Sequence, residues 1–598
     1  MNELTQNGRR TAIDQLLIVA AACAILLPNL GRTGLWDMDE ALYSTVAREM
    51  LQANNWIVPW FNGQLFPEKP PLMFWTMMGG FELFGVNEFG ARFFSVLMGI
   101  GTALAAFHLG RLLFSPRIGL WTGLITCSTI VFTISARAAT VDCALTFVTT
   151  LAMLLFVLAL RGQELPNGSA ATSTPLRWPY AVAMYACVGL AVLAKGPVGM
   201  LLPLAAMGLY LLAVNGWRSL FRSAWQMRPI TALVVIAAVA LPWYIAVGVK
   251  THGEWLEKFI WVFNLRPFQQ PIQSHGDALA IAAKILYYFY HIPGVLFGFF
   301  PWAVFLGPAL VNTVRELRRR PSDVPTDDVP ATSCGNKRNG IVLAVCWFGV
   351  WFVFWSICKT KLPHYLLPAY PALAMLVACW IDRWFEDKSG AVPAWEPRNA
   401  WISTILVGMT IAIALPIVAA YRLPGEQSLG LYGLILVLGG AWCWWESRHE
   451  HRGRAAAAFA LTSVVFLAAA FGFAALQVDR HQNAKPMIAA IHKDWASRSS
   501  PPPIATYGLF RESTVFYAGR PVARCSDDPA TGATARQLLK QFLAKHDRAY
   551  VIASNEDERE ITDAYPPGTF TVVGRWPRFL EPQSSASSEM IVLRAVRR

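Results

Sequence analysis

The sequence predicts a polytopic α-helical membrane protein with a small external α/β domain at its C-terminal end. Hydrophobic residues make up 55% of the 598 residues and charged residues only 15%, whereas soluble domains carry about 25% charged residues. Apolar runs of about 20 residues, each long enough to cross a bilayer as a helix, recur along most of the chain. The last part is polar and holds short runs of β-branched residues, which are typical of strands.

The apolar runs define about thirteen expected membrane-spanning helices. The first, Ala12 to Leu30, is interpreted as a retained signal anchor, and the last is Ala455 to Leu476. We therefore expect a membrane domain of residues 1–476, which includes an external loop of residues 31–92, and an external α/β domain of residues 477–598. Most of the ten cysteines lie inside apolar runs, so we expect no disulfide framework and no zinc site.

The distribution of arginine predicts the orientation of the chain. Loops on the same side as the N-terminus are the richest in this residue, and they include Arg111, Arg117, Arg218, Arg222, Arg228, Arg315, Arg318, Arg448, Arg452 and Arg454. The positive-inside rule then places the N-terminus in the cytoplasm and the C-terminal domain outside. Because short loops of this kind account for the net charge of +13, we expect no nucleic-acid partner.

The external loop of residues 31–92 holds the acidic residues that are the first candidates for catalysis. Asp39 and Glu40 open a segment with helical spacing of apolar residues, and Glu68 precedes Lys69 in a rigid stretch flanked by prolines. Paired acids also favour the first turn of a helix, so Asp39 has an alternative interpretation as a helix cap. Glu68 and Lys69 have an alternative interpretation as an ion pair in a rigid loop.

The expected topology brings further ionisable residues to the same external side. They are Asp142, Lys195, Lys361, His364 and Tyr365. Ionisable groups at membrane spans are costly and usually face a functional cavity, although some extend to the interface. Cations on one face can hold a phosphate while a carboxylate orients or deprotonates an incoming nucleophile, so this set favours a reaction with an acidic leaving group.

Several short motifs follow one another in a fixed order within residues 35–371. They are Asp39-Glu40, Glu68-Lys69-Pro70-Pro71, Lys195-Gly196-Pro197 and Lys361-Leu362-Pro363-His364-Tyr365. As an ordered set they resemble the GT-C polyprenyl-phosphate-sugar glycosyltransferases, in particular the family of the bacterial aminoarabinose lipid A transferase and the protein O-mannosyltransferases. The resemblance implies a multi-pass protein of the bacterial inner membrane, with its C-terminal domain in the periplasm. It also implies transfer of a sugar, with inversion, from a polyprenyl-phosphate carrier to an envelope acceptor such as lipid A, another glycolipid, a glycan or a protein.

The resemblance also assigns roles to individual residues. It implies that the catalytic residues are Asp39, the principal carboxylate, together with Glu40 and Glu68. The substrate-binding residues that it implies are Lys69, Asp142, Lys195, Arg266, Lys361, His364 and Tyr365, of which Lys195, Arg266 and Tyr365 would hold the lipid phosphate. We expect no required cofactor. Glu68 and His275 are the two residues that could together bind a divalent metal, as the resemblance suggests for some relatives. Leu42 and Asn264 stand where the aminoarabinose enzymes have Arg and His, so the sugar stays open.

Two other functions remain open at this point. One is transport of a lipid-linked or anionic substrate, and the other is a polymerase or ligase that uses lipid-diphosphate sugars. A transporter would place polar residues near the bilayer midplane in repeated, broken helices, whereas here they lie toward one face, which favours catalysis. The C-terminal domain shows no catalytic spacing among Glu512, His546 and Asp563, so we expect it to recognise the acceptor or to support the cavity.

Overall fold

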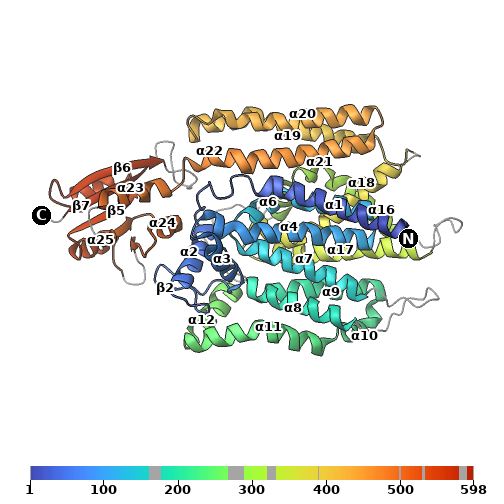
Figure 1. The fold of residues 1–598 in the computed structure, drawn as a ribbon, viewed down its shortest axis with the longest axis horizontal. Helices are drawn as coiled ribbons and strands as arrows, with labels where there is room; N and C mark the ends of the chain where they lie inside the picture. The colour runs from blue at the N-terminus through green and yellow to red at the C-terminus, as the bar shows by residue number, and fades with distance from the viewer. Residues whose placement is uncertain are drawn as a thin grey trace.

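The computed structural model describes residues 2–160, 177–266, 289–319, 331–387, 390–496, 500–527, 532–577 and 589–596. A long bundle of helices carries a sheet domain at one end (Figure 1). The N-terminus lies at the opposite end of the bundle, and the C-terminus lies at the far end of the sheet domain (Figure 1). The expected fold class, a polytopic helical protein with a small C-terminal α/β domain, is confirmed.

Ten helical segments of the described residues are long and apolar enough to cross a membrane. Their main helices are α4 (Glu88–Leu113), α7 (Val141–Leu160), α8 (Trp178–Lys195), α9 (Val198–Asn215), α11 (Pro229–Lys250), α17 (Ala331–Ile357), α18 (Tyr370–Glu386), α19 (Trp395–Arg422), α20 (Leu431–Arg448) and α21 (Arg452–Ala469). The 3-10 helix η5 (Pro363–Ala369) leads into α18 and belongs to the same span.

Two further segments are bent pairs rather than the straight helices expected from the sequence. The pair α5 (Pro116–Cys127) and α6 (Ile130–Arg137) bends by 64°, and α15 (His291–Gly298) bends by 115° against the helix over residues 302–318. If each pair is one span, the described residues hold twelve spans. The expected first span corresponds to α1 (Asn2–Leu26), which is not among the twelve and which carries four charged residues.

The two bends satisfy each other's polar groups. The backbone N–H of Ile130, freed where α5 ends, donates to the carbonyl of Phe300 at 3.0 Å. The indole of Trp302 donates to Ser128 Oγ at 2.9 Å. Broken helices are tolerated at membrane depth only where the protein itself binds the exposed backbone groups, and these contacts meet that need.

At the end of the bundle next to the sheet domain, which we call its outer end, the loop after α1 folds into α2 (Asp39–Gln52), a hairpin of β1 (Trp60–Phe61) and β2 (Gln64–Leu65), and α3 (Leu72–Phe84). Helix α2 is the segment with helical spacing of apolar residues that was expected to begin at Asp39. Two tryptophans, one from α11 and one from α12 (Glu254–Glu257), fix the loop between α2 and α3. The indole of Trp243 donates to Ile57 O, and the indole of Trp255 donates to Phe66 O.

The C-terminal domain is a five-stranded mixed sheet in the order β4-β3-β5-β7-β6. Its strands are β3 (Ile504–Tyr507), β4 (Ala523–Cys525), β5 (Arg548–Ser554), β6 (Phe570–Pro577) and β7 (Glu589–Val596). The side chains of β5 alternate between the two faces, as strand geometry requires. Tyr550 and Ile552 pack with α23 (Lys485–Trp495) and α24 (Glu512–Ala518), whereas Val551 and Ala553 pack with α25 (Ala535–Ala544) and α26 (Glu558–Asp563).

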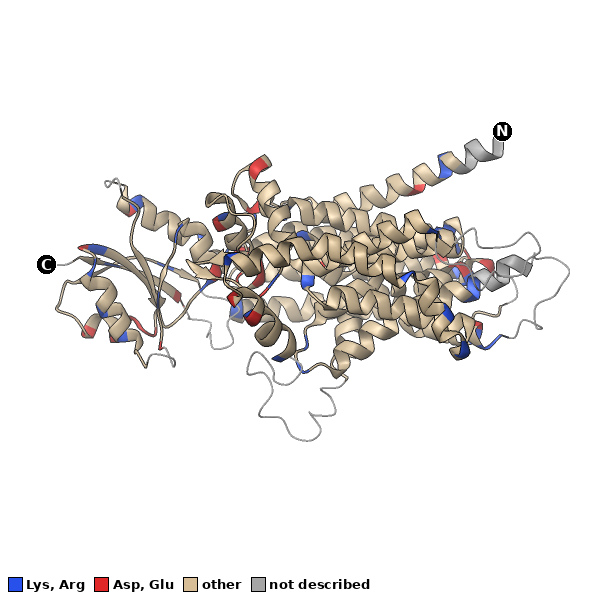
Figure 2. Ribbon diagram, turned by 90° about the horizontal axis from the view of Figure 1, so that it is seen from below, with Lys and Arg blue, Asp and Glu red and all other residues tan. Residues whose placement is uncertain are grey.

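Lysine and arginine gather at the end of the bundle that carries the N-terminus (Figure 2). The orientation itself stays a prediction, and two exposed glycines, Gly216 after α9 and Gly568 after α26, are suited to test it. In right-side-out membrane vesicles, we expect an epitope tag inserted after Gly216 to be protected from protease and one after Gly568 to be cleaved, because basic loops stay in the cytoplasm. Solubilised protein, in which both tags are accessible, is the control. Cleavage of the Gly216 tag in sealed vesicles would show that the chain has the opposite orientation.

Candidate functional site

Asp39 lies at the start of α2, at the outer end of the bundle, and its side chain is half-buried. One turn later, the hydroxyl of the buried Tyr43 donates to Asp39 Oδ1 at 2.9 Å. Burial raises the pKa of Tyr43, and the charges of Asp39, Asp142 and Glu68 raise it further. Tyr43 therefore stays protonated and holds one carboxylate oxygen, while the other oxygen of Asp39 has no hydrogen bond within the described residues.

Glu40 is a buried residue that binds Arg92 of α4. Arg92 donates from Nε and Nη2 to its two carboxylate oxygens at 2.7 and 2.8 Å, and the N–H groups of Trp36 and Ala139 each add a bond of 3.0 Å. Burial alone would raise the pKa of Glu40, but Arg92 and these hydrogen bonds hold it below its usual value. This placement favours a role in anchoring the loop, whereas the sequence grouped Glu40 with the catalytic carboxylates.

Glu68 and Lys69 lie side by side in the stretch before α3, and both are half-buried. Burial raises the pKa of Glu68, Lys69 opposes that shift, and the charge of Asp39 adds to it. Burial lowers the pKa of Lys69, whereas the carboxylates of Glu68, Asp39 and Asp142 raise it and Lys195 lowers it. These mutual effects show that the Glu68-Lys69 pair is within electrostatic range of Asp39, and Lys69 also of Asp142 and Lys195.

Asp142 and Lys195 form an ion pair at the outer ends of α7 and α8, with 2.5 Å between Lys195 Nζ and Asp142 Oδ1. The other carboxylate oxygen of Asp142 lies 3.6 Å from His364 Nε2. Lys195 Nζ also lies 4.4 Å from the centre of the Tyr365 ring and 5.9 Å from that of Trp355. The ammonium group is thus held by one carboxylate and two aromatic faces, which is a favourable environment for a cation.

A glycine turn fixes where α8 ends and hence where Lys195 lies. Gly196 has a φ of 74°, a conformation that other residues rarely adopt. A Cβ at this position would also lie 2.6 Å from the ring of Phe259 in η2 (Lys258–Leu265). The Lys195-Gly196-Pro197 motif therefore needs glycine for both conformation and space. Asn264 lies beside the same turn, and its side chain donates to the carbonyl of Phe259 at 2.8 Å.

We call the residues that meet here the outer cluster. Its members are Asp39, Tyr43, Glu68, Lys69, Asp142, Lys195, His364 and Tyr365. The structure thus brings together most of the residues that the sequence singled out, from segments up to 326 residues apart, the separation of Asp39 and Tyr365. Tyr43 and Trp355 were not given a role in the sequence. The spacing of four residues from Asp39 to Tyr43, which puts both on one helix face, is the signal that could have identified Tyr43.

The remaining predicted site residues have other surroundings. The Lys361 ammonium donates to the carbonyl of Ser356, and Arg266 is an exposed residue that directly follows η2. His275, the proposed second metal ligand, lies outside the described residues. Among the residues that the structure describes, His, Cys, Asp and Glu form no group of three or more that could hold a metal ion.

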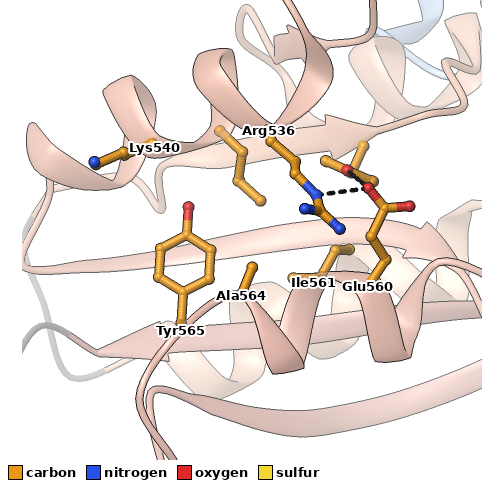
Figure 3. A pocket seen from close by; sticks show the side chains of 8 residues that line it. Arg536, Lys540, Glu560, Ile561, Ala564 and Tyr565 are labelled. Carbon is orange, nitrogen blue, oxygen red and sulfur yellow. Dashed lines mark hydrogen bonds and ion pairs between the residues drawn. The ribbon is translucent and has the colours of Figure 1, made fainter.

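A separate cavity of about 280 Å³ lies in the C-terminal domain, between α25 and α26 (Figure 3). Arg536 of α25 pairs with Glu560 of α26 at 2.9 Å, and the hydroxyl of Tyr507 donates to the same carboxylate at 2.6 Å. This cavity opens on the face of the sheet opposite to α24, so it is not part of the outer cluster.

Comparison with known proteins agrees with the motifs read in the sequence. Residues 68–245 match the family model described as dolichyl-phosphate-mannose-protein mannosyltransferase. The chain is 27% identical to undecaprenyl phosphate-alpha-4-amino-4-deoxy-L-arabinose arabinosyl transferase 2 of Proteus mirabilis, over 69% of this chain and 66% of that protein. It is 29% identical to the arabinosyl transferase of the same description from Edwardsiella ictaluri, over 68% and 65%. The chain therefore spans just under two thirds of the length of these two relatives.

The fold extends over nearly the whole chain in a solved structure. The crystal structure of ArnT from Cupriavidus metallidurans bound to undecaprenyl phosphate is similar with a TM-score of 0.73 at 22% identity, and the match covers 96% of this chain and 97% of ArnT. The apo structure of the same protein gives 0.72. The resemblance expected from the sequence is thereby confirmed.

Proposed function

We propose that this chain is a membrane glycosyltransferase of the GT-C class that moves a sugar from a polyprenyl-phosphate carrier to an acceptor in the bacterial envelope. The observation that carries the proposal is the outer cluster, in which the half-buried Asp39 carboxylate lies in electrostatic range of Lys69, in the loop before α3, beside the Asp142-Lys195 pair at the ends of α7 and α8. Transferases acting from undecaprenyl-phosphate-linked aminoarabinose are among its relatives, and the ArnT structure of the same fold binds undecaprenyl phosphate.

The cluster fits the chemistry of this transfer. An oxygen of the acceptor attacks the anomeric carbon of the sugar, the bond from that carbon to the phosphate oxygen breaks, and the carrier departs as its phosphate. Asp39 orients the acceptor oxygen and accepts its proton where it carries one, which is the role of a general base. Lys69 and Lys195 bind the donor phosphate, and their stabilisation grows as negative charge develops on the leaving group. Tyr43 keeps the Asp39 carboxylate in one orientation.

The finer assignments rest on the same reasoning. We propose the inner membrane as the site of action, with the outer cluster and the C-terminal domain in the periplasm, and inversion at the anomeric carbon. A pentose such as aminoarabinose is the first donor to test because of the relatives, and a hexose is the second. We propose an envelope glycolipid, glycan or protein as the acceptor. Lys69 and Lys195 neutralise phosphate without a metal, so we propose that no divalent ion is required.

A donor-binding experiment with purified protein tests the proposal. Lys195→Gln is expected to weaken binding of a polyprenyl-phosphate sugar and to slow its turnover by about 10- to 100-fold each, since a hydrogen bond to a charged group contributes about 1.5–3 kcal/mol. Lys258→Gln is the matched control, because Lys258 pairs with Glu254 on an exposed surface of the same outer region. Activity is also expected to survive a chelator. Movement of the intact donor across vesicles without release of carrier phosphate would instead identify a transporter.

A further inference from the structure

The C-terminal domain contacts the chain on both sides of Asp39. Arg511, which directly precedes α24, donates from Nε to Asp37 Oδ2 at 2.5 Å, and the backbone N–H of Ser513 donates to Asp37 Oδ1 at 3.0 Å. Next to these bonds, the N–H of Met38 donates to Glu512 Oε2 at 3.2 Å. Three consecutive residues of the domain, Arg511 to Ser513, therefore bind the two residues that immediately precede Asp39.

The turn that they bind has a backbone conformation that needs outside support. Met38 has φ 66° and ψ −124°, and it directly precedes the first residue of α2. A side chain other than glycine rarely adopts a positive φ, and such a conformation persists only where its surroundings impose it. Because this residue sets the direction in which α2 starts, the contacts of Asp37 and Met38 determine where the Asp39 carboxylate lies.

The contact continues along α24 as a well-anchored interface. Arg511 is buried and also donates to the carbonyl of Gln482 at 2.9 Å. Further along, Arg48 of α2, which is only 2% exposed, donates to the carbonyls of Val515 and Phe516 at 3.0 and 2.6 Å. Helix α24 lies beside α2 (Figure 1). The C-terminal domain is thus fixed both to the start of α2 and to the middle of α2.

We infer that Arg511 and Glu512 are positioning residues that act through Asp37 and Met38 on Asp39, so that the C-terminal domain completes the catalytic geometry without itself contacting the substrate. This inference rests on the proposed function, because it assigns an effect on turnover to the placement of Asp39. It differs from the expectation that the domain serves acceptor recognition, since a positioning role lowers kcat and leaves the binding of donor and acceptor unchanged.

Arg511→Gln in the full-length purified protein tests the inference. We expect kcat to fall about 10- to 100-fold, the cost of a displacement near 1 Å at a catalytic group, with KM for both substrates within about twofold. Arg548→Gln is the matched control, because Arg548 forms an Arg-Asp pair with Asp494 in the same domain and its side-chain hydrogen bonds among the described residues go to Asp494 and Tyr550, not to α2. An equal loss of kcat in both variants would show a general effect of domain stability and would overturn the inference.

A second variant covers the case in which Arg511→Gln does not fold. Asp37→Asn changes only the acceptor of this contact, whose side chain is 22% exposed, and it should lower kcat by a similar factor. The double variant should be no slower than the slower single variant, since both remove one interaction. Full kcat in Asp37→Asn, or additive losses in the double variant, would contradict the inference. These two results would leave the proposed function intact as long as the wild-type protein transfers sugar and Asp39→Asn does not. Absence of transfer by the wild-type protein would contradict the proposed function itself.

Discussion

Asp39→Asn is expected to lower turnover by about 10²- to 10⁴-fold, the contribution usual for a group that takes a proton in the transition state. Asparagine keeps the shape of the side chain and can still accept the hydrogen bond from Tyr43. It lacks the charge and the basicity that the reaction needs. Donor binding should change by less than about threefold, because the phosphate is held by lysines rather than by Asp39.

The measurement is single-turnover sugar transfer beside equilibrium binding of the donor. Asp563→Asn, an exposed aspartate at the end of α26, makes the same chemical change far from the outer cluster and should leave both quantities unchanged. Tyr43→Phe should give an intermediate loss, since it frees the Asp39 carboxylate without removing it. If the Asp39 variant keeps near-normal turnover, the aspartate is only the first residue of a helix and the catalytic assignment is withdrawn.

Glu40→Gln is expected to lower the stability of the protein by about 3–5 kcal/mol, because breaking a buried ion pair leaves Arg92 as a buried charge without its partner. Arg92 is 3% exposed and also donates to backbone carbonyls of residues 30, 33 and 34, so it cannot turn toward water. The loss should appear as a lower unfolding temperature in detergent.

A double-variant cycle separates this structural role from a catalytic one. Glu40→Gln with Arg92→Gln should be much less destabilised than the sum of the single variants, because each single change already removes the shared interaction. The exposed pair of Lys258 and Glu254 is the control, and its removal should cost only about 0–1 kcal/mol. An unchanged unfolding temperature combined with lost turnover would return Glu40 to the catalytic group.

The membrane helices and the composition of the outer cluster could be predicted because each depends on local or one-dimensional information. Apolar runs of sufficient length mark the spans, and counting the spans assigns Asp142, Lys195 and Tyr365 to one side of the membrane. The pairing of Glu40 with Arg92 could not be predicted, because Asp39 and Glu40 are adjacent in the sequence and only the start of α2 determines which of them faces the outer cluster.

Contacts between distant segments explain the other differences. The bend between α5 and α6 lies in an apolar run that reads as one straight helix, and its polar groups are satisfied by Phe300 and Trp302, far along the chain. Arg511 likewise binds a residue 474 positions before it. Periodicity describes which face of an element is apolar, but it does not specify which distant element binds a given polar group.

The mutual contact of the two bent helix pairs has a consequence for how the protein is made. Ser128 and Trp302 are 174 residues apart, and the helices between them leave the ribosome and enter the bilayer first. Until the later pair arrives, the N–H of Ile130 has no carbonyl of Phe300 to bind, and an unsatisfied backbone group is costly in lipid. The backbone of the early pair is therefore fully satisfied only after the segment that carries Phe300 and Trp302 has been synthesised.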